Sequence, residues 1–489
     1  MVIKMNKEIK RYIIIAISLL LMFTFKYIPA PSGLSISGMQ VLGIFLGVLL
    51  LWLTISIDWP SILMIGALAL VPELNFSKIL SGAYGSGTFV FLMYTFILTY
   101  ALGKTSFIKR IAMSFITSKF AKKGPWAFVI LYFASIIFVG CFISPTVLFF
   151  VYLPIVEEIC NILKLKKGDK LSAMLMMGTV IMCGISSGMT PIAHVFPLIA
   201  IGLYSDVMGH VINYASFMMV AIPVGIISSI LIILMFKLIL KPDMSVLKDF
   251  DPSKISGVDG KTTKSENIIL GIFIFVVLLW VVPGLITSII KSGPIYDCLK
   301  WIDSFGTPMP PLIGIVILCI ININGEPLLK VNEAMSKGVS WPSLIMCAST
   351  LALGSAITNT DIGLTTWLSS NLTPLISGLS PIVMVLIFTL WAAIQTNLSS
   401  NMVTSTLVTT AALAIISSMN NINIAGVVIN IGIMASYAFA TPPAMPCVAI
   451  ASSSGYTNTM QMMKYGFIAM FICVMVATFI GYPISMLVI

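Results

Sequence analysis

The stretch 394–412 combines many polar side chains with a complete absence of charge. It reads I-Q-T-N-L-S-S-N-M-V-T-S-T-L-V-T-T-A-A, and strongly apolar sequence flanks it. Hydroxyl and amide groups gain nothing from lipid, and irregular backbone is tolerated at membrane depth only where it is buried in protein or lines a polar cavity. We therefore predict a re-entrant hairpin whose tip, 399–401, offers oxygens to a small hydrophilic solute. The alternative is a single span whose Ser and Thr side chains bond to neighbouring helices.

A second interruption lies in the first half of the chain. The apolar segment 125–163 is broken at F-I-S-P-T, where Pro145 lacks a backbone donor and disfavours helix at Ser144. The next segment, 171–207, is too long for one crossing and is interrupted by S-S-G-M-T-P at 186–191. These patterns predict a hairpin followed by a broken helix, although Pro145 could equally be a kink with no role in binding.

Such interruptions can bind ions of both signs. The N-termini of half-helices attract anions, and unwound backbone offers carbonyl oxygens to Na⁺. Every Lys and Arg falls in a loop or at the end of a span, so an anion would be held by helix ends, by Thr146, Ser400 and Asn401, and by a co-bound cation. Both tips and both breaks lack carboxylates, which disfavours a carboxylate proton relay and a divalent-metal cage.

His194 is one of two histidines and follows the Thr190–Pro191 dipeptide. At the depth of the predicted site, an imidazole could bind an anion when it is protonated, or carry a proton. A hydrogen-bonded histidine that only packs between helices is the alternative. Met402, beside the second tip, is expected to pack, while a contact with substrate would favour a less polar solute.

Composition places the chain in the membrane. Of its 489 residues 58% are hydrophobic and 9% are charged, so the chain is a polytopic membrane protein in which helices of about 20 residues cross the bilayer. The net charge of +10 comes from short loops and does not imply nucleic-acid binding. The eight cysteines are scattered and suggest neither disulfides nor a metal site, and no cofactor is expected apart from Na⁺ as a coupling ion.

The apolar segments follow the same order in both halves. Eleven crossings are predicted, at 11–28, 37–57, 59–72, 86–103, 171–207, 214–240, 267–290, 305–322, 340–358, 424–456 and 464–487. Each half has an interfacial stretch, 104–123 or 361–372, and a hairpin, 125–163 or 379–417. The second broken helix is interrupted at A-T-P-P-A-M-P, residues 440–446.

The distribution of basic residues orients the predicted spans. With a cytoplasmic N-terminus, only Lys26, Lys78, Lys291 and Lys300 face outward, which places the C-terminus outside. The two hairpins then enter from opposite sides, which is typical of an inverted repeat. We divide the chain into scaffold helices and arm 1–124, transport unit 125–240, cytoplasmic linker 241–266, scaffold helices and arm 267–378, and transport unit 379–489.

The chain also carries a family resemblance that runs over most of its length. A-S-Y-A-F at 435–439, followed by Pro442, Ala444 and Pro446, resembles the second broken helix of the divalent-anion/sodium symporter family, and 213–242 resembles the span between its halves. The family has Ser-Asn-Thr at both tips, where this chain has S-P-T at 144–146 and S-N-M at 400–402. Its broken helices carry a Thr/Ser-Pro-Pro-Asn signature, matched here by H-V-F-P at 194–197 and M-P-C-V at 445–448.

The resemblance implies particular ligands. One cation site would use Thr396, Ser399, Asn401 and the Ala444 carbonyl, although Thr396 and Ser399 could simply bond to a neighbouring helix. The other would use Gly140, Ser144, Pro145 and Ala193. The substrate would contact both tips and both breaks, at Ser144, Pro145, Thr146, Thr190, His194, Ser400, Asn401, Met402 and Met445.

The sequence thus predicts a secondary transporter, not an enzyme. The expected cargo is a small organic anion such as a di- or tricarboxylate, coupled to a cation and moved across the cell membrane by an elevator-like mechanism in a homodimer, as the resemblance implies. A sodium-independent exchanger and a proton-coupled carrier stay open. Two opposed dead-end hairpins do not form the continuous lining of a channel, and no catalytic motif such as H-E-x-x-H is present.

Overall fold

The computed structural model contains helices almost throughout the part of the chain that it describes. That part comprises residues 7–248, 250, 255, 262–290, 292–364, 366–367, 370–371, 378–417, 419 and 421–489. The predicted linker 241–266 and interfacial stretch 361–372 therefore lie partly outside the described residues.

The described part of the first half contains eleven α-helices. They are α1 Lys7–Thr24, α2 Ile36–Thr54, α3 Trp59–Leu68, α4 Phe76–Tyr84, α5 Gly87–Gly103, α6 Phe107–Ile116, α7 Pro125–Gly140, α8 Pro145–Ile162, α9 Lys170–Met189, α10 Val195–Met208 and α11 Tyr214–Met235. Short 3₁₀ turns follow α1, α6 and α11, at Phe25–Tyr27, Ala121–Lys123 and Ser245–Leu247.

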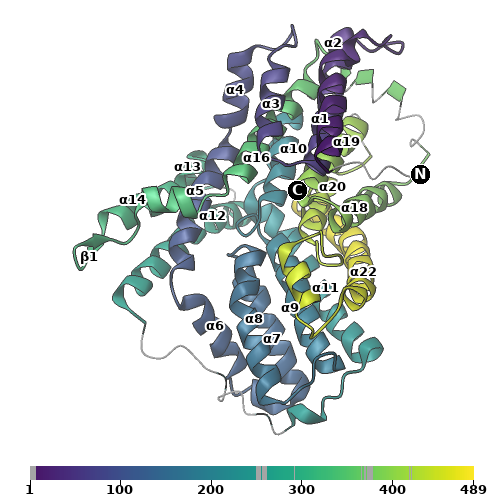
Figure 1. Ribbon diagram of the computed structural model, residues 1–489. Coiled ribbons are helices and arrows are strands. Elements are labelled where there is room, and N and C mark those ends of the chain that lie inside the picture. The colour runs from purple at the N-terminus through teal and green to yellow at the C-terminus, as the bar shows by residue number, and fades with distance from the viewer. Residues whose placement is uncertain are drawn as a thin grey trace, which may run out of the picture.

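The second half repeats much of this order. Its described helices are α12 Lys264–Ile289, α13 Pro294–Ser304, α14 Met309–Ile320, α15 Val331–Lys337, α16 Trp341–Thr358, α18 Pro381–Leu398, α19 Asn401–Ile416, α20 Ile424–Ser436, α21 Pro446–Ser453, α22 Thr459–Val476 and α23 Tyr482–Val488. Two-residue antiparallel strands, β1 Asn322–Ile323 and β2 Glu326–Pro327, follow α14 and project to the left in Figure 1.

Local sequence fixes where many of these helices begin. α7, α8, α18 and α21 each carry Pro in the first turn, where the missing N–H costs no helical hydrogen bond. α11, α20 and α22 begin after an Asn cap; the Asn213 side-chain oxygen accepts from the Ser216 N–H at 2.7 Å. Proline or an asparagine cap therefore marks the start of these seven helices in the sequence.

Each half contains a hairpin, a broken helix and a following helix. The hairpins are α7–α8 and α18–α19, and the broken helices are α9–α10 and α20–α21. The first segment of each broken helix packs against both arms of its own hairpin. The following helices, α11 and α22, both end in a π-helical turn, Phe236–Leu240 and Ala477–Gly481. In Figure 1 the first hairpin lies at the bottom, and α18–α20 lie above it on the right.

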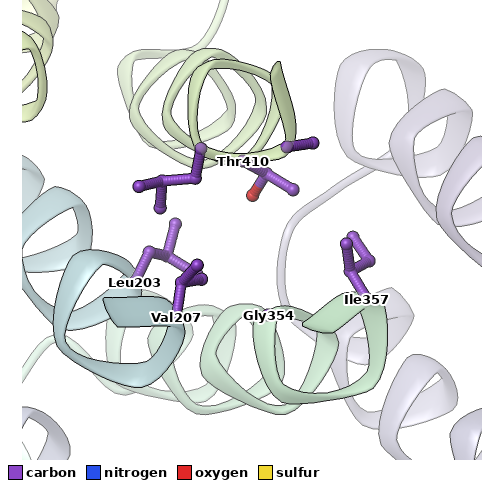
Figure 2. Close-up of a pocket in the computed structure, with 7 residues that line it drawn as sticks. Leu203, Val207, Gly354, Ile357 and Thr410 are labelled. Carbon is purple, nitrogen blue, oxygen red and sulfur yellow. The ribbon is translucent and has the colours of Figure 1, made fainter. Parts of the chain in front are cut away.

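The remaining helices pack beside these units. α16 packs against α3 and α4, α2 packs against α1 and α3, and α14 packs against α5 and α12. They meet the hairpin units mainly where α10 packs on α16, α6 on α7 and α11 on α12. Figure 2 shows an apolar pocket at the first contact, lined by Leu203, Val207, Gly354, Ile357, Thr410, Leu413 and Ala414.

The structure confirms an all-α polytopic membrane protein. Within the described residues, eight helices are long and apolar enough to cross a membrane, or up to ten if each of two bent helix pairs counts as one span. The number of eleven crossings stays a prediction.

Several predicted boundaries are wrong. Residues 186–189 belong to α9, so the first interruption covers 190–194 and not 186–191. The second starts earlier than predicted, at Tyr437, because α20 ends at Ser436. Helices α4, α13 and α15 and the strand pair were not predicted; α4 and α13 are amphipathic, so a search for continuous apolar runs misses them.

Candidate substrate and cation site

The turn of the second hairpin consists of two serines with different roles. Ser400 precedes α19, and its hydroxyl oxygen accepts from the Val403 N–H at 3.4 Å. Ser399 turns back, donating to the Gln395 carbonyl at 3.0 Å. Both predicted ligands are thus at the tip, but their hydroxyl groups are engaged within the hairpin itself.

Three other predicted cation ligands do converge. One terminal atom of the Asn401 amide lies 3.2 Å from the Ala444 carbonyl oxygen and 3.0 Å from both the hydroxyl and the carbonyl oxygen of Thr396. The oxygen and nitrogen of an amide are distinguished only by their hydrogen-bonding partners. The partners favour the nitrogen in this position, where the amide donates to all three acceptors without any cation. With the oxygen there, four oxygens meet and repel one another unless a cation lies among them.

The surroundings of this oxygen cluster hold it in place. Thr396 is fully buried and donates its hydroxyl hydrogen to the Ala435 carbonyl at 2.8 Å, leaving the oxygen free to accept. Asn401 and Ala444 are 6% and 7% exposed. The cluster therefore joins the end of α18, the start of α19 and the break between α20 and α21.

Asn397, which sequence analysis did not single out, ties the same hairpin to the same break. Its amide nitrogen donates to the carbonyls of Ala393 and Tyr437, each at 2.9 Å. Its amide oxygen accepts from the N–H groups of Phe439 at 2.9 Å and Ala440 at 2.8 Å. The signal was present, because a buried amide in an apolar membrane segment needs partners.

The first hairpin is tied to its break by fewer polar contacts. Thr190 is buried, and its hydroxyl donates to the Cys141 carbonyl at the hairpin turn. A Cβ at Gly140 would lie 2.0 Å from the Ser186 hydroxyl, so α7 and α9 approach closely there. Ser144 precedes α8 without a side-chain cap, and Pro145 occupies the first turn.

Thr190, Ala193 and His194 lie together in the first break, which covers 190–194. Ala193 is 6% exposed and His194 directly precedes α10. The His194 ring packs against Phe196 with centroids 3.9 Å apart, while its Nδ1 atom is buried without a hydrogen-bond partner. The structure therefore does not show the hydrogen-bonded packing role considered for His194.

The two breaks are neighbours. A Cβ at Gly188, near the end of α9, would lie 2.7 Å from the Tyr437 ring, and one at Gly432 would lie 3.1 Å from Pro197 Cα in α10. The Ser405 hydroxyl of α19 also donates to the Phe196 carbonyl at 2.7 Å. Glycines therefore allow the interrupted segments of the two halves to pack closely.

Four helices begin at the tips and breaks: α8 after Ser144, α10 after His194, α19 after Ser400 and α21 after Met445. Their first turns present backbone N–H groups, as anion binding requires. Thr146 lies in the first turn of α8, and Met402 and Met445 are 6% and 5% exposed. Within the described residues, no group of three or more His, Cys, Asp or Glu side chains could hold a metal ion.

Comparisons with known proteins identify the family of this chain. Residues 6–489 match the family model described as the sodium:sulfate symporter transmembrane region. The chain belongs to the sodium:sulfate symporter family. Members of this family are membrane transporters, so the chain is a multi-pass transport protein and not an enzyme.

Several named transporters are similar in sequence to this member of the sodium:sulfate symporter family over most of its length. The sodium-dependent dicarboxylate transporter SdcS of Staphylococcus saprophyticus is 26% identical over 474 residues, covering 92% of this chain and 87% of the relative. Its Staphylococcus aureus counterpart is 25% identical, covering 89% and 84%. The chloroplastic dicarboxylate transporter 1 of Spinacia oleracea is 24% identical over 72% of this chain and 59% of the relative.

Among solved structures that share the fold of this chain is a bacterial transporter. The Alcanivorax borkumensis YdaH transporter aligns with a TM-score of 0.54 at 12% identity, over 83% of this chain and 86% of that one.

Proposed function

We propose that this protein is a Na⁺-coupled symporter of a small organic dianion of the dicarboxylate class. The supporting relatives are named as sodium-dependent dicarboxylate transporters. The observation that carries the proposal is the convergence of the Asn401 amide, both Thr396 oxygens and the Ala444 carbonyl. Na⁺ is a hard cation that suits such uncharged oxygens, and filling the cluster fixes the hairpin tip against the second break.

The bound cation would prepare the site for its anion. The described tips and breaks contain no Lys or Arg, so two substrate carboxylates must be held by helix N-termini and by hydroxyl and amide groups. A Na⁺ beside the α19 N-terminus adds a positive charge in a surrounding of low dielectric constant, where it acts strongly. Substrate therefore binds best after the cation, which is the basis of coupling. We assign the substrate contacts to Ser144, Pro145, Thr146, Thr190, His194, Ser400, Asn401, Met402 and Met445.

Transport would follow an elevator-like path. Units 125–240 and 379–489 form one moving body, and 1–124 and 267–378 form the static body of a homodimer. A rigid movement keeps the ligands of both tips together, whereas separating the hairpins would leave unpaired backbone groups in an apolar interior. The apolar contact between α10 and α16 is suited to sliding, because α16 carries no charged side chain that would have to leave an ion pair.

Uptake into proteoliposomes tests the proposal. We expect an inward Na⁺ gradient to drive accumulation of radiolabelled succinate, and sulfate or a monocarboxylate to compete less well than a dicarboxylate. A K⁺ gradient of equal size is the control. Uptake that does not depend on Na⁺ would contradict symport. A requirement for succinate on the opposite side would favour the exchanger, and a requirement for a proton gradient would favour the proton-coupled carrier.

His194 is the observation that favours the proton-coupled alternative. Its Nδ1 atom is buried without a partner and could take a proton during transport. Uptake driven by a pH gradient without Na⁺, and lost in His194→Gln, would support that second candidate.

A further inference from the structure

The two halves differ at one position where the hairpin meets the break. Ser144 and Ser400 precede α8 and α19, so Cys141 and Asn397 each lie three residues earlier, at equivalent positions. Thr190 donates its hydroxyl hydrogen to the Cys141 carbonyl, and Thr441 donates in the same way to the Asn397 carbonyl. Only the second half adds a side-chain amide to this arrangement.

That amide coincides with a difference in the backbone. α9 stays helical until Met189, directly before Thr190, whereas α20 ends at Ser436, five residues before Thr441. The second half therefore has about one extra unwound turn, 437–440, fully buried away from water. Unwinding leaves N–H and carbonyl groups without helical partners, and leaving them unsatisfied is costly.

Asn397 supplies the missing partners. Its oxygen accepts from the Phe439 and Ala440 N–H groups, and its nitrogen donates to the Tyr437 carbonyl. Cys141 has no comparable donor and acceptor pair, and the corresponding turn of the first half remains helical. The unwound turn leads to Ala444, whose carbonyl belongs to the oxygen cluster around Asn401.

We infer that Asn397 is the positioning residue of the second cation site: its amide holds the unwound turn 437–440 open and thereby fixes the Ala444 carbonyl. Asn397 does not touch the cation; it acts through the backbone. The cation part of this inference rests on the proposed Na⁺ symport, whereas the structural part does not.

The first test is Asn397→Leu, which has a similar size and removes all four side-chain bonds. Its matched control is Asn430→Leu, because Asn430 is also fully buried in α20 but bonds to the Ala477 carbonyl, away from the break. We expect the Na⁺ concentration for half-maximal succinate uptake to rise at least about tenfold in Asn397→Leu, with the maximal rate at saturating Na⁺ within about twofold of wild type. Asn430→Leu should leave half-saturation unchanged.

A second readout needs neither Na⁺ nor substrate. Cys447 lies at the start of α21 and Cys183 lies in α9, and both are fully buried. Alkylation by N-ethylmaleimide, followed for each native cysteine by peptide mass spectrometry, should be at least about tenfold faster at Cys447 in Asn397→Leu and unchanged at Cys183. Asn397→Asp keeps both acceptor contacts, so it should give an intermediate rate and also serves if the leucine variant does not fold.

The outcomes separate the two proposals. If wild-type uptake ignores Na⁺ but Cys447 is still exposed selectively, the symport proposal fails and the structural role of Asn397 stands. If Cys447 stays protected in both variants, or if Na⁺ half-saturation does not move although Cys447 is exposed, the positioning role is overturned. An equal shift in Asn430→Leu also overturns it, because any lost buried amide would then have the same effect.

Discussion

The Thr441 hydroxyl donates a hydrogen bond to the backbone carbonyl of Asn397. This contact joins the second break to the last turn of the first arm of its hairpin. The Thr190 hydroxyl makes the same contact with the Cys141 carbonyl in the first half. A threonine within each break thus bonds to each hairpin turn, and the repeat is visible in single hydrogen bonds as well as in the order of the helices.

Removing these two hydroxyls should have unequal effects. Thr190→Val should lower the free energy of unfolding by about 1–2 kcal/mol, since it leaves the Cys141 carbonyl without this donor. Thr441→Val should cost less, about 0.5 kcal/mol, because the Asn397 side chain still bridges hairpin and break. Unfolding of the purified protein in detergent measures both.

The control for this pair is Thr409→Val. Thr409 is fully buried in α19, and its hydroxyl has no partner, so the substitution should be neutral or stabilising. Equal losses in Thr190→Val and Thr441→Val would contradict the view that Asn397 supports the second break.

Substitutions at the two tips should also differ. Asn401→Ala removes one proposed oxygen ligand of the cation, and Thr396→Val removes another, so both should weaken Na⁺ stimulation of uptake at least about tenfold. Ser144→Ala should be milder, because the first tip has Pro145 where the second has its amide. Uptake at matched membrane abundance decides between them, and a greater loss in Ser144→Ala would refute the assignment of the better cation site.

Cross-links should distinguish movement of the whole body from separation of its halves. A Cβ at Gly432 would lie 3.4 Å from the Ala200 Cβ, close to disulfide geometry, so the pair Ala200→Cys and Gly432→Cys joins α10 and α20 within the proposed moving body. Oxidation of this pair should leave uptake intact.

The complementary pair joins the moving body to the scaffold. Leu203→Cys and Gly354→Cys face each other across the α10–α16 contact, and their cross-linking should arrest uptake until the link is reduced. The elevator model would be excluded if cross-linking the internal pair arrested uptake while cross-linking the interface pair left uptake intact.

Bulk at the same interface should slow transport without weakening cation binding. A Cβ at Gly354 would lie 2.6 Å from Leu203, so Gly354→Val crowds the contact and should reduce the maximal uptake rate several-fold. The Na⁺ concentration for half-maximal uptake should stay within about twofold of the wild-type value, because the substitution does not touch the oxygen cluster. Gly66→Val in α3 is the control, since nothing lies within 4 Å of a Cβ there.

Topology can be tested by labelling from the two faces. Lys167→Cys, between α8 and α9, should react with an impermeant maleimide from the cytoplasm. Asn421→Cys, between α19 and α20, should react from outside, because the two hairpins are expected to enter from opposite sides. Reaction of both positions from the same face would contradict the prediction that the two hairpins enter the membrane from opposite sides.

The sequence by itself determined the features that depend on local chemistry. An all-helical membrane protein with two hairpins and two broken helices was predicted from the long apolar segments, from Pro145 and from the uncharged Ser/Thr/Asn-rich stretch at 394–412. The family resemblance was visible in the sequence as well. These follow from the cost of placing polar or unpaired backbone groups in lipid, which acts on each segment separately.

Only the tertiary structure decided which segments supply the hydrogen-bond partners of each other's buried polar groups. Whether α20 unwinds at Tyr437 or at Ala440 depends on Asn397, forty residues earlier in the chain and adjacent to the break only after folding. Thr396, Asn401 and Ala444 likewise form one oxygen cluster only when hairpin and break pack together. Hydropathy and proline positions describe each segment, but the partners of a buried amide come from other segments, and that pairing is a property of the folded chain.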